Sequence, residues 1–270
     1  MTLVHPYLKL PQLRTFPRPT GLRQTMNTQQ QTSVGERYVR TNAELRAAIG
    51  ECAAAGQSSG AGAGDVNVPF GFSICMVGPI RISEPIIIPV ECSGLHIRQL
   101  GRVPLLPDGV VSTVFDVRAA LVTISDLLVV SESIADMFTA FVTLGATQAD
   151  RCRVLHNHVV ADRVFLSDAT NDATRCIILG NQQQSVNDTH DAPIVINGSR
   201  NTVEANHLAD GDGVSDVITV ASGARNRIIG NYCDGGDITT TASSGNSAVW
   251  FNDEVGTLAL HGTDSSGGNT

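Results

Sequence analysis

Four arginines in the second half of this chain recur at a nearly constant interval, and their side chains are suited to binding anions. The intervals between them are 24, 25 and 25 residues. A guanidinium group pairs with a carboxylate or a phosphate through two parallel hydrogen bonds. A row of such groups predicts a cationic stripe that contacts an acidic neighbour or a glycan. The four residues are Arg151, Arg175, Arg200 and Arg225.

A second interpretation of the arginine row needs no ligand. Like charges held close together repel one another, so outward-facing arginines would pair with acids in nearby turns. The sequence offers Asp126, Asp150 and Glu204 for such pairs. Both interpretations stay open at this point.

Two pairs of aspartates, each beside glycine, could carry acid–base chemistry. They lie in the stretches "ADGDG" and "CDGGD". Glycosidases use two carboxylates that are about 5 Å or about 6.5–9.5 Å apart, and calcium prefers the same oxygen ligands. Asp-Gly pairs are also common turn formers that need no further role. The candidate residues for binding a glycan or a partner are therefore Asp210, Asp212, Asp234 and Asp237.

Histidine and cysteine form no metal-binding pattern. His156, His158 and His207 follow the arginine row, and we expect them to be stacked outward residues rather than ligands. The six cysteines are scattered without C-x-x-C pairs, which argues against a zinc site and against a dense disulfide framework. We expect reduced, buried cysteines, no metal, no cofactor and no catalytic residue.

The arginines belong to a longer repeat. The segments "DRCRVLHNHVVAD", "TRCIILGNQQQSV", "SRNTVEANHLADG" and "ARNRIIGNYCDGG" begin at positions 150, 174, 199 and 224. In each copy an apolar column follows the arginine, formed by Val154, Ile178, Val203 and Ile228. An asparagine column then closes each copy, formed by Asn157, Asn181, Asn206 and Asn231.

A repeat of this length, built from β-branched runs and turns without helical periodicity, predicts a parallel β-helix. Each copy becomes one coil, and like residues stack at about 4.8 Å. The apolar column then fills the interior. The asparagines form a side-chain ladder at a turn, where this residue type tolerates left-handed backbone. We expect about seven coils over residues 56–260.

One helix is predicted, at residues 41–55, where "TNAELRAAIGECAAA" starts with a Thr41–Glu44 capping-box pattern. It is placed to cover the N-terminal end of the stack, whose strand edges would otherwise be exposed. The last ten residues, 261–270, are polar and rich in glycine. They predict a flexible tail.

Residues 1–40 predict an extended arm. They contain four prolines, and six basic residues stand against a single acid, so the arm carries about +5 while the remainder carries about −13 of the net −8. A basic arm on an acidic body favours an acidic protein partner rather than nucleic acid. No signal peptide or membrane span is recognisable here. The candidate attachment residues are Lys9, Arg14, Arg18 and Arg23.

The order of these segments resembles a known family. An amphipathic "TNAELRAAI" helix, a glycine-rich loop, "IRISEPIIIP" and then asparagine-punctuated coils are similar to the pectin-lyase-like right-handed β-helix proteins. Within that group the resemblance is to phage tailspikes and other phage virion proteins. It covers about residues 41–260 and implies a right-handed parallel β-helix, a homotrimer, and attachment to the virion through a short N-terminal arm.

The catalytic signatures of that family are incomplete in this chain. The NTD, DD and GHG motifs of its polygalacturonase-like members are missing, and so is the RxPxxR stretch of its pectate-lyase-like members. The stretch "VWFND" at 249–253 resembles the lyase VWIDH motif, but Asn252 and Asp253 replace its acid and its histidine. We therefore expect no enzyme.

The sequence thus favours a bacteriophage structural protein that decorates or cements a capsid, or adapts a tail. It would be assembled in the host cytoplasm and would bind other virion proteins through residues 1–40, with no nucleic acid or membrane partner. The alternative is a small tailspike-like protein that binds or cleaves host surface polysaccharide. A cellular β-helix module with a carbohydrate-related role is a third hypothesis, which the basic arm disfavours.

Overall fold

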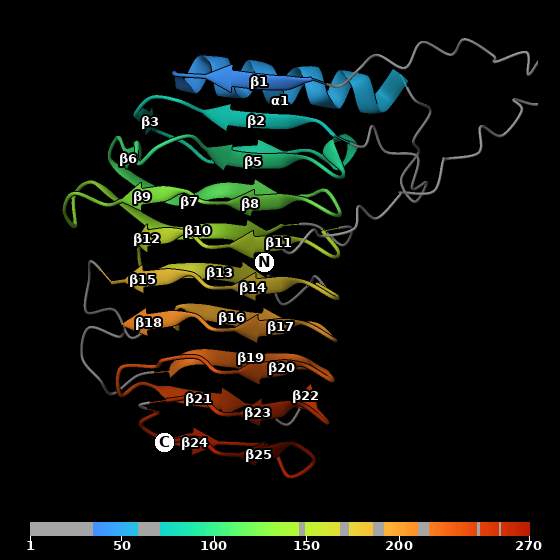
Figure 1. The fold of residues 1–270 in the computed structure, drawn as a ribbon, viewed down its shortest axis with the longest axis vertical. Coiled ribbons are helices and arrows are strands. Elements are labelled where there is room, and N and C mark those ends of the chain that lie inside the picture. The colour runs from blue at the N-terminus through green and yellow to red at the C-terminus, as the bar shows by residue number, and fades with distance from the viewer. Residues whose placement is uncertain are drawn as a thin grey trace, which may run out of the picture. The chain divides into compact units, whose positions relative to one another are not determined.

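The computed structural model describes residues 35–58, 71–145, 149–167, 173–185, 192–209, 216–241, 244–253 and 255–270. These residues all belong to one compact unit, Val34–Thr270. They form a parallel β-solenoid, as the repeat predicted: strands stack coil upon coil into three parallel sheets (Figure 1). Every strand pair between neighbouring coils is parallel.

The first sheet has ten strands in a single line. Like residues lie directly opposite in it, as in the register Val154–Ile178 and Val203–Ile228. The apolar column of the repeat is therefore a stack of buried side chains. Its strands are β1 (Glu36–Val39), β2 (Ser73–Met76), β5 (His96–Gln99), β8 (Thr123–Ser125), β11 (Arg153–Leu155), β14 (Ile177–Leu179), β17 (Thr202–Glu204), β20 (Arg227–Ile229), β23 (Ala248–Trp250) and β25 (Ser265–Gly267).

The second and third sheets complete each coil. The second sheet contains β3 (Ile80–Ile82), β6 (Pro104–Pro107), β9 (Leu128–Val130), β12 (His158–Val160), β15 (Gln182–Gln184) and β18 (His207–Ala209). The third sheet contains β4 (Ile86–Ile88), β7 (Val110–Val117), β10 (Met137–Leu144), β13 (Arg163–Ser167), β16 (Ile194–Asn197), β19 (Asp216–Ala224), β21 (Asp237–Thr240) and β24 (Leu258–Ala259), and the short β22 (Ser244–Gly245) pairs with β19.

Six coils in the described part of the chain contain all three strands, from β2–β3–β4 to β17–β18–β19. In the next two coils the second-sheet strand is reduced to single bridges, His207–Tyr232 and Tyr232–Asp253. The stack of about seven coils that we expected thus corresponds to six complete coils with narrower coils below them.

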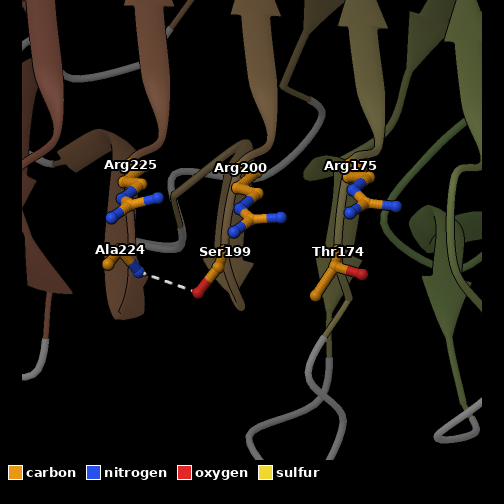
Figure 2. A pocket seen from close by; sticks show the side chains of 6 residues that line it. All are labelled: Thr174, Arg175, Ser199, Arg200, Ala224 and Arg225. Atoms are coloured by element: carbon orange, nitrogen blue, oxygen red, sulfur yellow. Dashed lines mark hydrogen bonds between the residues drawn. The ribbon is translucent and has the colours of Figure 1, made fainter.

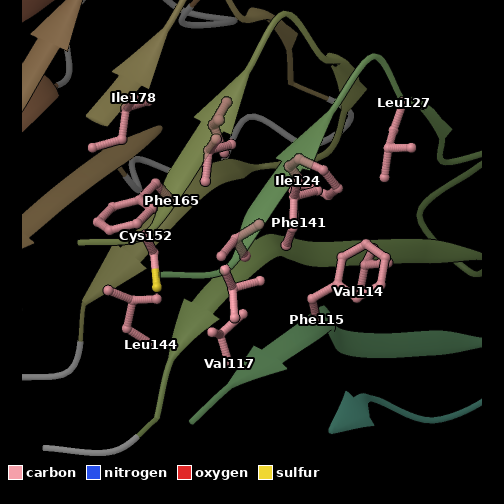
Figure 3. Packing of buried hydrophobic residues seen from close by; sticks show 14 of the residues in the cluster. Val114, Phe115, Val117, Ile124, Leu127, Phe141, Leu144, Cys152, Phe165 and Ile178 are labelled. Carbon is pink, nitrogen blue, oxygen red and sulfur yellow. The ribbon is translucent and has the colours of Figure 1, made fainter. Parts of the chain in front are cut away.

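The interior of the stack is one continuous apolar core. Figure 3 shows its middle, where Phe115, Phe141 and Phe165 lie beside small side chains such as Cys152. The rings of Phe115 and Phe141 meet edge to face at 5.9 Å, an arrangement that aromatic pairs favour.

A helix covers the N-terminal end of this core. Helix α1 (Asn42–Ser58) buries Leu45, Ala48, Ile49 and Cys52, and it lies on the first coil beside the short 3-10 helix η1 (Val90–Cys92) (Figure 1). One half of the predicted capping box is present: the Glu44 N–H donates to Thr41 Oγ1 (3.1 Å). The Glu44 carboxylate accepts the N–H of Arg40 (2.6 Å), one residue before the cap, rather than that of Thr41.

Two expected boundaries differ from the structure. The arm was expected to run to residue 40, but Glu36–Val39 form β1 and pair with β2. The last ten residues were expected to be a flexible tail, but Ser265–Gly267 pair with β23. Thr270 also donates its N–H to the carbonyl of Asn252. The segment is held because Ser265 and Thr270 donate their N–H groups to the carbonyls of Ser247 and Asn252, one coil above.

The six cysteines are free and buried, as expected. Cys152 and Cys176 stack in adjacent coils, and the neighbouring Cys176 thiol together with burial raises the pKa of Cys152 well above its ordinary value. Burial raises the pKa of the Cys233 thiol to about 12. These thiols therefore act as small core residues. Within the described residues, no helix is long and apolar enough to cross a membrane.

Candidate functional site

Each coil turns into the first sheet through one residue with left-handed backbone, and we call this turn the first corner. Seven successive coils have a left-handed residue at this position, and in four of them that residue is arginine, with φ between 55° and 63°. Left-handed backbone costs a residue with a Cβ about 1–2 kcal/mol. The seven residues are Gly94, Leu121, Arg151, Arg175, Arg200, Arg225 and Asn246.

Hydrogen bonding between coils explains why the backbone turns here. The Arg175 N–H donates to the carbonyl of Ser199 (3.1 Å), and the Arg200 N–H donates to the carbonyl of Ala224 (2.9 Å). The Arg225 N–H continues the series to Gly245 (2.9 Å). The left-handed residue thus keeps the ladder unbroken around the corner. This places each arginine side chain at the same point of its coil.

Three of these arginines line one hollow. Figure 2 shows Arg175, Arg200 and Arg225 side by side, one from each coil, with their guanidinium groups extended in the same direction. The hollow has a volume of about 480 Å³, and Thr174, Ser199 and Ala224 complete its lining. All three arginines are exposed. We call this feature the arginine hollow.

The pairing expected for these arginines is found only at the upper end of the row. Arg151 Nε lies 3.4 Å from the Asp150 carboxylate, and Asp150 also accepts a hydrogen bond from the Thr174 hydroxyl (2.5 Å). Within the described part of the chain, no acidic side chain pairs with Arg175, Arg200 or Arg225. Among the described residues, the alternative interpretation, in which turn acids neutralise the row, is thus supported at Arg151.

The predicted asparagine ladder lies at the second corner, where the chain passes from the first sheet to the second. Asn181 Oδ1 accepts hydrogen bonds from both the backbone and the side-chain amide of Asn157 (3.1 and 2.9 Å). Its own side-chain amide donates to Asn206 Oδ1 and to the carbonyl of Val154. Asn252 and Asn269 extend the ladder to six members: Asn157, Asn181, Asn206, Asn231, Asn252 and Asn269.

One detail of that prediction was wrong. The asparagines were expected to adopt left-handed backbone themselves, but the residue before each one does so instead. The asparagine then points inward, and all members except the half-buried Asn269 are buried, where the amides replace the partners that water would have supplied. The left-handed residues of this second corner are Asp126, His156, Gly180, Ala205, Gly230, Phe251 and Gly268.

The first corner carries a shorter ladder of the same kind. Asn201 Oδ1 accepts from the Cys176 N–H (2.8 Å), and Asn226 Oδ1 accepts from the Asn201 N–H (2.9 Å). In the coils above, Cys152 and Cys176 occupy the equivalent position. The column of cysteine and asparagine next to the arginines is therefore the inward face of the corner.

The aspartate candidates are only partly described. Asp210 and Asp212 lie outside the described residues, so their convergence with the other pair stays a prediction. Asp234 sits in a tight turn with φ 42°, and the Asp237 carboxylate accepts the Thr257 N–H (2.5 Å). Asp237 also lies opposite Asp216 in the neighbouring strand. Asp237 thus has a structural contact.

The other residue groups singled out in the sequence stack along the coils. His158 and His207 lie in register with Gln182 between them, and the His207 ring meets Tyr232 at 4.5 Å. In "VWFND", Asn252 is a member of the asparagine ladder, and Asp253 forms a bridge with Tyr232. The described residues hold no group of three or more histidine, cysteine or acidic side chains that could bind a metal.

A polar network on the first coils was not anticipated from the sequence. Arg98 and Tyr38 both bond the Glu36 carboxylate, at 2.5 and 2.7 Å, and so connect β1 to β5 across β2. His96 Nε2 lies 3.0 Å from Ser125 Oγ, whose hydroxyl donates to Asp126 (2.7 Å). These residues are far apart in the sequence, and only the stacking of coils brings them together.

The network shifts several pKa values. The hydrogen bonds from Tyr38 and Arg98 hold the pKa of Glu36 below its ordinary value, and the same carboxylate raises the pKa of Tyr38. Burial, and then the charge of Arg98, lowers the pKa of His96. Since the Ser125 hydroxyl hydrogen points to Asp126, the neutral imidazole donates its Nε2–H to Ser125. The network anchors the first strand of the stack.

The attachment-arm candidates Lys9, Arg14, Arg18 and Arg23 lie outside the described residues, so their role stays a prediction. What can be located is the point where the arm joins the solenoid. Residues 1–35 precede β1, which is the first strand of the first sheet at the end covered by α1.

Comparison with known proteins identifies no family. No family model matches the sequence, and no curated protein matches it. A solved structure described as "Geobacillus virus E2 - ORF18" is similar, with a TM-score of 0.35 and 12% sequence identity. The likeness covers 84% of this chain and 56% of that one, so this chain spans little more than half of that protein's length. The chain is a parallel β-solenoid with a structural likeness to this phage protein.

Proposed function

We propose that this protein is a structural component of a bacteriophage virion, attached to the capsid or the tail through the residues that precede β1, 1–35. It would act as a homotrimer that decorates or cements the particle, or as an adaptor. The proposal assigns it no catalytic reaction. It is assembled in the host cytoplasm and bound by other virion proteins.

The observation that carries this proposal is the separation of charge along the chain. Residues 1–40 carry about +5 and the remainder about −13. Residues 1–35 lead directly into β1, and Arg98 and α1 hold β1 through Glu36 and Arg37. A pull on the arm would therefore be transmitted to a strand that belongs to the continuous first sheet. The ladders of buried asparagines would keep the body stiff under that load.

Co-sedimentation with virions and empty capsids of the phage that encodes the chain tests this role. The key variant of the full chain neutralises the arm by Lys9→Gln, Arg14→Gln, Arg18→Gln and Arg23→Gln. A matched control removes four body arginines instead, by Arg81→Gln, Arg102→Gln, Arg153→Gln and Arg227→Gln. We expect the unmodified chain and the control to pellet and the arm variant to remain in solution.

Two results would contradict the proposal in different ways. Equal pelleting of the arm variant would remove the arm as the attachment segment. Failure of the unmodified chain to pellet with either particle would remove the virion role itself. Equilibrium sedimentation of the unmodified chain checks the trimer separately.

The arginine hollow favours a second candidate function, the binding of a polysaccharide on the host surface. Three exposed guanidinium groups without acidic partners in the described residues would suit an anionic ligand. Cleavage of that polysaccharide is the stronger form of this candidate. Incubation with host polysaccharide and measurement of released reducing sugar, for the unmodified chain and for Asp234→Asn, tests it directly.

A further inference from the structure

We infer that the outer face of the second sheet binds a second copy of this chain, with the two stacks side by side and related by a two-fold axis parallel to the stack. This pairing goes beyond the proposed function. It is also separate from the homotrimer proposed there, since it uses one sheet and does not involve the other two. It rests on three features around β6: exposed apolar side chains, similar turns at both ends of the strand, and opposite charges in those turns.

The upper part of the second sheet carries apolar side chains on its outer face. Alternate residues of a strand point to opposite faces, so Pro104 and Leu106 of β6 point outward on either side of the buried Leu105. Leu128 and Val130 do the same on β9, the next strand of this sheet (Figure 1). All four outward side chains are only partly buried. An apolar strip thus faces solvent on two neighbouring coils.

Exposed apolar residues also lie at both ends of this strip. Leu100, which precedes the turn into β6, is 59% exposed, and Val110, which follows the turn out of β6, is 64% exposed. Ile134 is exposed in the loop of the next coil, and this loop is tied to the turn because the Asp136 carboxylate accepts the Gly109 N–H (3.0 Å). Apolar side chains gathered in this way mark protein–protein contacts.

The two turns that flank β6 resemble each other. Gly101 and Gly109 both have left-handed backbone, with φ of 82° and 85°. Counted outward from Leu105, each direction reaches a charged residue after three positions, a glycine after four and an apolar residue after five. The charged residues have opposite sign, Arg102 on one side and Asp108 on the other. The two ends of the strand therefore match, except that their charge is reversed.

This pattern complements a second copy of itself. A two-fold axis parallel to the stack keeps each coil level with its equivalent and reverses the strand direction, so Arg102 lies opposite the partner's Asp108. By symmetry, Asp108 lies opposite the partner's Arg102, as in any isologous contact. Both residues are exposed, and neither forms an ion pair within the described residues. The pairing gives each of them a partner of opposite charge.

The charges also select the arrangement of the pair. A two-fold axis along the strands would keep the strand direction and place Arg102 opposite the partner's Arg102, where the like charges repel. The axis parallel to the stack avoids this repulsion and leaves α1 of both copies at the same end. A binding site for an unrelated protein does not require the two ends of β6 to match, so the pattern favours a second copy as the occupant.

Charge reversal tests the pairing. Association of the full chain would be measured by sedimentation velocity at concentrations up to about 100 μM, which detects contacts of micromolar affinity. Arg102→Asp and Asp108→Arg, each introduced alone, place like charges opposite each other at both contacts. We expect either change to weaken association at least about tenfold. A trimer formed through other faces would persist, so the mass would fall to that of a single chain or a single trimer.

A mixture of the two variants gives the sharpest result. One chain then supplies both carboxylates and the other supplies both guanidinium groups, so we expect the mixture to associate within about threefold of the unmodified chain. Arg227→Asp is the matched control, because it makes the same change of charge at an exposed position of the first sheet. It should alter association less than about twofold. Circular dichroism would confirm that all the variants fold.

Three results would overturn the inference. A mass that neither single variant lowers would show that this face makes no contact. Failure of the mixture to associate would reject the two-fold arrangement. Equal weakening by Arg227→Asp would show that net charge, and not this face, governs association. None of these results depends on sedimentation with virions, so the pairing and the proposed virion role can fail separately.

Discussion

The two corners of the coil both need left-handed backbone, but they carry different side chains. Each turns through one left-handed residue, followed by a residue that points into the core. At the second corner the left-handed position carries residues as different as Gly180, Ala205 and Phe251. At the first corner arginine occupies it in four successive coils.

The difference separates the needs of the fold from those of a ligand. Because the second corner accepts such varied residues, left-handed backbone by itself does not select arginine. The residues that recur at the second corner are the inward asparagines, which bond to both neighbouring coils. At the first corner the recurring residues are arginines, whose side chains are exposed. The second corner thus stabilises the stack, and we propose that the first corner binds.

The largest loss of stability is expected when the second corner loses the side-chain amide of one inward asparagine. Asn206→Ala would leave the Asn181 N–H and the Ile178 carbonyl without their side-chain partner in a buried site. Each unsatisfied group costs about 1–3 kcal/mol, so we expect a loss of about 3 kcal/mol in the free energy of unfolding. Urea denaturation measures it. A loss below about 1 kcal/mol would show that the ladder contributes little.

A smaller effect is expected where the second corner loses a glycine. Gly230 has a φ of 64°, and an added Cβ would meet no atom within 4 Å. Gly230→Ala would therefore cost about 1 kcal/mol from backbone strain alone. Gly50→Ala in α1 is the matched control, since its Cβ also meets open space. In a helix this change should stabilise the protein instead.

At the first corner, replacing the left-handed residue by glycine is expected to stabilise the protein. Arg200→Gly would relieve left-handed strain and charge repulsion, and we expect a gain of about 0.5 kcal/mol in the free energy of unfolding. Arg227→Gly, which lies in strand β20 two residues after Arg225, should instead destabilise by a similar amount. If Arg200→Gly also destabilised the protein, the arginine would have a structural role that the comparison denies.

The smallest effect is expected in the pH dependence of stability. It arises at neither corner but in the polar network on the first coils. The pKa of His96 lies below its ordinary value of 6.5 in the folded protein. The unfolded chain then binds the proton more readily, so stability is present above pH 6.5 and is lost as the pH falls through the folded-state pKa. Urea midpoints between pH 7 and pH 5 would measure this loss.

His96→Gln should make those midpoints less dependent on pH. Glu36, whose pKa is lowered from 4.5, contributes to acid sensitivity only below that window. His158→Gln is the control, as that exposed histidine lies on the second sheet, away from the network. An equal flattening in the control would place the acid sensitivity elsewhere.

Much of the fold could be predicted because a solenoid repeats its environment. The columns Val154–Ile178 and Asn157–Asn181 could be aligned in the sequence since each coil places the same residue at the same point. One half of the capping box of α1 was also predicted, since its contact joins residues three positions apart. Local and periodic interactions leave a pattern in the sequence.

The candidate site shows where such prediction ends. The arginine row was visible, but the sequence offered Asp126, Asp150 and Glu204 equally as partners. Only the structure shows that Asp150 reaches Arg151 and that the next three arginines share a hollow. The contact of His96 with Ser125 left no trace at all, because 29 residues separate them outside the regular repeat.

The sequence by itself determined the stacking of coils, the capped N-terminal end and the inward columns, because each follows from a local pattern or a fixed period. The tertiary structure alone decided that, among the described residues, Asp150 pairs with Arg151 and that the next three arginines share a hollow. It also decided that Ser265–Gly267 form a strand rather than a tail. The physical reason is the same in both cases: a side chain or a short segment finds its partner one coil away, at a distance that only the folded stack sets.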